Sequence, residues 1–195
     1  VTAIGGEVSI TGSDNSVGVG GPVDMAGGNG HGGGGVTIVG GASSTMTGSS
    51  LSLSGGVGLT AGGAVNLQGG SSSTAHGGNF DVTGGSGDNG VGGDVLIHSG
   101  HGGDMGGSVS LQSSVGAHGQ SGSVFVGTAS AVSNSGDLVL VSGASADGSS
   151  GDVTFTAASG SMIGGGVTVA GGNGLDGGSV DLMSGEGAND GVASF

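Results

Sequence analysis

Short apolar-any-apolar triplets recur along the whole chain, and a polar, glycine-rich linker follows each one. Two of them, Val95-Leu96-Ile97 and Val109-Ser110-Leu111, lie in the stretch from Asp94 to Gly122. Thirteen triplets follow one another at nearly equal intervals, and none has a polar first or third residue. Regular self-similarity of this kind is typical of a repeat architecture. The triplets begin at Val8, Val23, Val36, Leu51, Val65, Phe80, Val95, Val109, Val124, Leu138, Val153, Val167 and Val180.

The triplet pattern has the period of a β-strand. In a strand, residues i and i+2 share a face, so the first and third side chains of a triplet point one way and the middle side chain points the other. Most middle residues are polar, as in Ser9, Thr37 and Asp81, which indicates a solvated outer face. The triplets are therefore expected to be short, half-buried strands, with glycine at the corners where the backbone turns.

Two classes of linker alternate along the chain, and this alternation sets the size of the expected structural unit. Triplet starts taken two apart, at Val8, Val36, Val65 and Val95, define a unit of ~29 residues. The sequence thus predicts an all-β fold, a single-chain parallel β-solenoid of about 13 short triplet strands with two strands per coil. Residues 1–195 are expected to form one repeat domain. A thinner coil of half that length, with one triplet per coil, is the alternative.

Composition favours a thin structure over a globular one. The chain has 56 glycines, no Trp, no Tyr and four Phe, so large side chains are too few for a thick core. Glycine-rich and serine-rich sequence is also typical of disordered linkers. Disordered chains, however, are poor in β-branched residues and do not space them regularly. Disorder in isolation, including a chain that folds only on assembly, is the competing interpretation.

Charge restricts the partners. The net charge is -14 with no Lys or Arg, and phosphate backbones and anionic membrane surfaces would repel such a chain. We therefore expect no nucleic-acid partner, and no membrane insertion because no apolar run approaches the ~20 residues of a membrane span. The absence of Cys leaves the redox compartment open. An acidic, lysine-free, glycine-rich and serine-rich composition favours an extracellular or cell-surface location.

Candidate chemistry is sparse. The 14 acidic residues lie mostly before triplets or in linkers, where turn formation and solubility account for them. His98, His101 and Asp104 have the residue types of a metal cluster, but no histidine recurs at the repeat period. The stretch from Gly171 to Asp176 matches the start of a calcium-binding nonapeptide that genuine calcium rolls carry in tandem, which is not the case here. We predict no catalytic residue, no cofactor and no metal ligand, with calcium at isolated turns as the alternative.

A few apolar residues interrupt the polar outer column. Leu96, Phe125 and Val139 are middle residues of triplets, and Val141 follows close by. An exposed apolar patch of these four residues would favour lateral contact with another rod, unless a linker folds over it. The mixed outer column does not keep the ranked threonine array typical of ice-binding solenoids.

The motif GG-x-V-x-L-x-S-G, at Gly92 to Gly100 and Gly107 to Ser114, carries a family resemblance. It resembles the Gly/Ser/Val-rich tandem repeats of large cell-surface and extracellular-matrix proteins of algae and bacteria. The resemblance extends over essentially the whole chain and implies an extracellular structural or adhesive role. The resemblance assigns no functional role to any particular residue of this chain.

The expected function follows from the ends of the predicted solenoid. An uncapped solenoid exposes strand edges that pair end to end, and Val1, Ile4, Val192 and Phe195 make both ends apolar. The sequence predicts a structural subunit of an extracellular fibre that stacks head to tail with copies of itself, with other matrix components as further partners. The alternative is a single-rod binding or adhesive module, either ice-binding or glycan-contacting. A β-helix hydrolase would need an acidic cluster and basic groups that the chain lacks.

Overall fold

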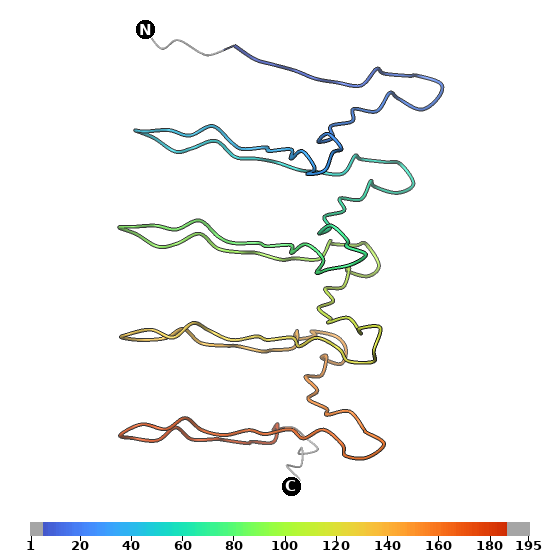
Figure 1. The fold of residues 1–195 in the computed structure, drawn as a ribbon. Helices are drawn as coiled ribbons and strands as arrows, with labels where there is room; N and C mark the ends of the chain where they lie inside the picture. Colours follow the sequence, from blue (N-terminus) through green and yellow to red (C-terminus); the bar gives the residue numbers. More distant parts are fainter. Residues whose placement is uncertain (1–5, 187–195) are drawn as a thin grey trace. The chain divides into compact units, whose positions relative to one another are not determined.

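The computed structural model describes residues 6–186 of the chain. Within this range there is no α-helix and no β-strand, and the one bridge between backbone segments is an isolated antiparallel pair, Val115 with Ser121. Figure 1 accordingly draws the coloured trace without coils or arrows, and the chain doubles back on itself repeatedly. The chain divides into two units, Val1–Ile97 and His98–Phe195.

The predicted parallel β-solenoid is wrong for the described chain. A coil of that kind requires each triplet to bond a triplet about one coil later in the sequence, and no sheet of either coil size forms between residues 6 and 186. The linkers close on themselves over much shorter distances instead. Closing a short loop restricts the chain less than closing a long one, and strands of three residues provide few ladder bonds to offset the difference.

The expected apolar core is also missing. None of the residues that the structure describes is buried. The chain exposes 18858 Å², whereas a compact monomer of its mass would expose ~7,900 Å² and a fully unfolded chain ~25,000 Å². The first and third residues of the triplets therefore do not form the thin buried layers that the strand pattern predicted.

Most linkers close at a fixed position relative to their two triplets. In ten of the twelve linkers the second residue before a triplet donates its amide N–H to the carbonyl of the third residue after the preceding triplet. These bonds measure 2.8 to 3.1 Å and close loops of seven to nine residues. We call this meeting point the neck of a linker, made by the second and third residues after one triplet and the second residue before the next. The donor and acceptor pairs are Gly21 and Ser13, Gly34 and Gly28, Ser49 and Gly41, Gly63 and Gly56, Gly78 and Gly70, Gly93 and Gly85, Gly107 and Gly100, Gly122 and Ser114, Gly165 and Ala158, and Gly178 and Gly172.

The neck is the most shielded part of the chain. With one exception, Gly102, the residues of intermediate exposure in the described range are second residues after a triplet. Where the residue is a glycine of a closed neck, the facing backbone segment of the same linker covers it, as Gly93 covers Gly84. These residues are Gly12, Gly27, Gly55, Gly69, Gly84, Ser113, Ser142 and Ala157.

Glycine is required at the neck because the backbones approach closely. A Cβ added to Gly84 would collide with the carbonyl oxygen of Gly93, and a Cβ added to Gly93 would lie 3.2 Å from the nitrogen of Gly85. In all twelve linkers at least one of the two facing positions is glycine. Where serine replaces one glycine, as at Ser49 or Ser99, the facing residue is still glycine. One side chain fits in the neck, and the sequence never places two there.

Polar side chains shape several loop tips. The amide N–H of Ala75 donates to the Ser72 hydroxyl oxygen at 3.0 Å, and that of Met46 donates to the Ser43 hydroxyl oxygen at 2.9 Å. The Asn15 side-chain oxygen accepts from the amide of Gly18 at 2.9 Å. These are the local turns that Ser and Asn form with their own backbone.

Replacing Ser72 with Ala should loosen its loop tip without opening the neck below it. The Ala75 amide loses its acceptor, and because this bond is exposed to water we expect only about a twofold rise in the hydrogen-exchange rate of that amide. The exchange rates can be followed by NMR. The neighbouring change Ser73→Ala removes a hydroxyl that makes no hydrogen bond to the tip and should leave the Ala75 amide unchanged. Equal effects of the two changes would contradict this role for Ser72.

Candidate functional site

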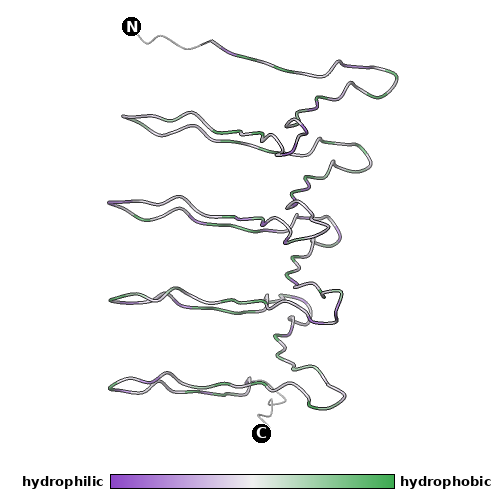
Figure 2. Cartoon of the chain, viewed as in Figure 1, coloured by the Kyte–Doolittle hydropathy of each residue, from purple (hydrophilic) through white to green (hydrophobic). Residues whose placement is uncertain are grey.

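The triplets form the most regular exposed feature of the molecule. From Val23 onward, the first residue of every triplet is 45 to 63% exposed. Linker residues such as Val57 and Val132 are fully exposed, with exposed fractions of 105% and 109%. The first residues of the triplets, which we call the first column, are thus about half covered by neighbouring parts of the chain and half exposed to solvent. Figure 2 shows hydrophobic and hydrophilic stretches alternating along the chain.

The backbone of the triplets has no partner within the described chain. None of the backbone hydrogen bonds between residues 6 and 186 uses an amide or a carbonyl of a triplet, because all of them lie in the linkers. A folded protein of ordinary composition makes about one internal hydrogen bond per residue. From Val23 onward, each triplet therefore presents both a half-exposed apolar side chain and backbone groups without a partner in the described range.

Half of the acidic residues adjoin this feature. Glu7, Asp94, Asp137 and Asp152 directly precede a triplet, and three more occupy middle positions. All seven are exposed. The middle positions are Asp24, Asp81 and Asp181, the last of which accepts a hydrogen bond from the Ser179 hydroxyl at 3.1 Å. The triplets thus combine apolar side chains with negative charge at their borders.

The linker after Val109-Ser110-Leu111 makes the densest set of backbone bonds. Gly116 donates to the Gln120 carbonyl at 2.6 Å and Gly119 donates to the Gly116 carbonyl at 2.9 Å, above the neck bond from Gly122 to Ser114. Gly119 has a φ of 86°, a conformation that favours glycine. The sequence Gly116-Ala117-His118-Gly119 supplies the glycine where the turn requires it.

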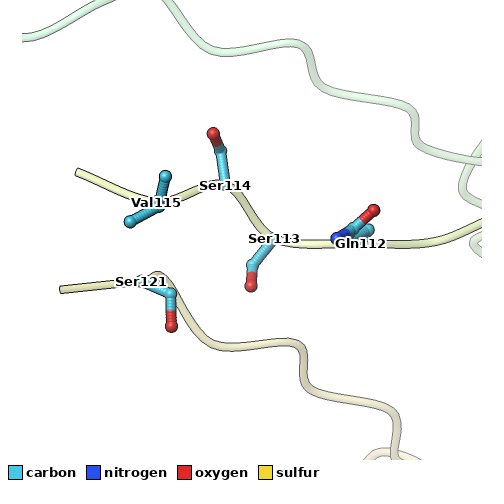
Figure 3. A pocket seen from close by; sticks show the side chains of 5 residues that line it. All are labelled: Gln112, Ser113, Ser114, Val115 and Ser121. Atoms are coloured by element: carbon cyan, nitrogen blue, oxygen red, sulfur yellow. The ribbon is translucent and has the colours of Figure 1, made fainter. Parts of the chain in front are cut away.

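A shallow hollow lies on this linker and is lined by Gln112, Ser113, Ser114, Val115 and Ser121. In Figure 3 the hydroxyls of Ser113 and Ser121 point to one side of the linker and that of Ser114 points to the other. Hydroxyl and amide groups can bind a polar ligand by hydrogen bonds. No charged or buried group lines this hollow, so it offers weaker means of binding than an enclosed pocket.

No family model, curated protein or solved structure matches this chain. The resemblance to tandem repeats of extracellular-matrix proteins therefore stays a prediction, and the assignment of function depends on the chain's own residues.

The predicted contact residues fall in different parts of the molecule. Leu96 lies in the first unit, while Phe125, Val139 and Val141 lie in the second. All four are exposed, and the ring of Phe125 lies close to Gly127. Their predicted role in lateral contact stays a prediction. The four end residues, which are Val1, Ile4, Val192 and Phe195, lie outside the described residues.

The candidate metal residues are not brought together. Over residues 6–186 no three His, Asp or Glu side chains converge on a point that could hold an ion, so His98, His101 and Asp104 do not form a cluster. The turn from Gly171 to Asp176 lies in a linker that closes through its neck like nine others, by a bond from Gly178 to Gly172. No helix in the described range has the length and apolarity to cross a membrane.

Proposed function

We propose that this protein is a structural subunit of an extracellular fibre and associates with copies of itself through its triplets. The observation that supports the proposal is the repeated column of half-open apolar side chains, which has no core to enter within the described chain. Water-exposed apolar surface favours association because burying it releases ordered solvent. The triplets are the part of the chain best suited to that association.

The amount of open surface is ample for assembly. The chain exposes about 11,000 Å² more than a compact monomer of its mass. A standard stable interface buries only ~1,600 Å² in total. A small fraction of the open surface would therefore suffice for a stable contact with each of several neighbours.

A second copy matches the triplets better than an unrelated partner does. Two copies carry triplets at the same regular spacing, so one contact places the next pair in reach of each other. A regular array also permits pairing in staggered positions, which leaves triplets unpaired at both ends for further copies. Growth by repeated addition is the behaviour of a fibre rather than of a closed dimer.

Composition supports the extracellular setting and limits other partners. The chain has a net charge of -14 and no Lys or Arg, which disfavours nucleic acid and anionic membranes and leaves neutral or cationic matrix components as further partners. Stacking through solenoid ends is not part of this proposal, because the solenoid is absent from the described chain.

Sedimentation velocity and electron microscopy over a wide concentration range test the proposal. We expect monomers at low concentration and elongated assemblies above a critical concentration, with the critical concentration falling as salt screens the like charges. A monodisperse monomer at high concentration in native buffer would falsify the proposal. It would favour a binding module that acts as a single chain.

A further inference from the structure

We propose that the carboxylates bordering the triplets regulate self-association by holding copies of this chain apart. This inference rests on the proposed function and concerns the control of the same contact. Its basis is the position of the acidic residues relative to the triplets, together with the absence of Lys and Arg from the chain.

Pairing of two triplets brings their borders close together. When a triplet of one copy pairs with a triplet of another, the residues directly before and within both triplets come as close as neighbouring strands, about 5 Å apart. Asp94, Asp137 and Asp152 immediately precede triplets and are exposed. Wherever two triplets with acidic borders pair, these carboxylates therefore approach carboxylates of the second copy. The linker acids, which are Asp14, Asp88 and Asp147, lie several residues from the nearest triplet.

No basic residue compensates these carboxylates. Most proteins can pair an interfacial carboxylate with Lys or Arg, which turns repulsion into a salt bridge. This chain has neither residue, so no arrangement of two copies can do so. Every carboxylate that approaches another in the contact adds repulsion, which weakens with distance and with salt.

The border carboxylates act on assembly as a restraint. Charged residues next to apolar, strand-forming segments are known to restrain uncontrolled association. Here they occur on seven of the thirteen triplets and leave six uncharged. The uncharged triplets can initiate contact, while the bordered ones set the concentration and ionic strength at which contact spreads along the chain.

The test compares two triple variants of the full chain that have the same net charge. One variant is Asp94→Asn, Asp137→Asn and Asp152→Asn at triplet borders, and the other is Asp14→Asn, Asp88→Asn and Asp147→Asn in linkers. At low salt, about 0.01 M, we expect the border variant to assemble at a roughly threefold lower critical concentration than the linker variant. Near 1 M salt, where the screening length falls to ~3 Å, the difference should vanish.

The outcomes separate the two proposals. Equal critical concentrations for both variants at low salt would overturn the regulatory role of the border carboxylates and leave self-association standing. A difference that persists unchanged at high salt would also overturn it, because a charge effect must be screened. Failure of the parent chain and of both variants to assemble at any salt concentration would overturn the proposed function, and this inference with it.

Discussion

Changing Val65, Val95 and Val124 to Thr should raise the critical concentration for assembly about 50-fold. All three are first residues of triplets and are 49 to 50% exposed in the single chain. Thr keeps the shape of Val but replaces a methyl group with a hydroxyl, which loses about 0.8 kcal/mol per site if that group is buried between copies. Three sites together amount to about 2.4 kcal/mol, and every ~1.4 kcal/mol is a factor of ten. Pelleting across a concentration series measures the change.

The matched control changes three linker valines, which are Val57, Val91 and Val132, to Thr. They are 96 to 109% exposed, so they are even more open to water than the column residues. If assembly depends on the triplets, the control should assemble like the parent chain. If assembly were unspecific aggregation of exposed apolar side chains, the control would weaken it at least as much, and the triplets would lose their assigned role.

Replacing Gly84 and Gly93 together by Ala should open the neck of their linker. Gly93→Ala alone should be tolerated, whereas Gly84→Ala alone requires the backbone to shift, because the new Cβ would collide with the Gly93 carbonyl oxygen. Ser99 opposite Gly107, and Ser49 opposite Gly40, show that the neck accommodates one side chain. Two would place a Cβ from each backbone segment in the same gap and would separate the residue 93 amide from the Gly85 carbonyl. Losing that bond, worth about 1 kcal/mol, should speed exchange of the residue 93 amide about fivefold.

A double-mutant cycle measures this effect cleanly. The single variant Gly93→Ala should leave the exchange rate of the residue 93 amide close to that of the parent chain. Gly84→Ala should raise that rate only modestly, because a linker with Ser113 at the equivalent position still forms its neck bond. The double variant should then show a coupling of about 1 kcal/mol, within the range found for residues in direct contact. Strictly additive changes would show that the pairing of glycine with a larger residue across the neck has no steric cause.

The hydropathy pattern alone identifies the repeating triplets but not which segments of the chain contact each other. The alternation in Val95-Leu96-Ile97 predicts that the first and third residues share a buried face, but Ile97 is as exposed as Leu96. The first residues of the triplets are less exposed than linker residues such as Val57. A period of two, however, says nothing about which segment pairs with which. The predicted sheet required contacts about one coil apart, and the described chain closes its linkers over seven to nine residues instead.

The sequence carries a signal for the neck that the hydropathy pattern does not reveal. Glycine content by itself indicates only flexible corners, whereas the informative pattern is the pairing of two positions, such as Gly84 with Gly93, of which at least one is always glycine. That rule becomes visible only when positions are counted both forward from one triplet and backward from the next. The hollow beside Ser113 and Ser121 had no comparable signal, because serine is common throughout the chain.

The local closure of each linker also bears on how such a chain changes in evolution. Because both ends of a linker meet at one neck, a duplication or deletion of one linker with its triplet leaves every other neck intact. Recombination between repeated gene segments can therefore alter the number of repeats without disturbing those that remain. Chain length, and with it the number of contacts per molecule, becomes a quantity that selection can adjust one repeat at a time.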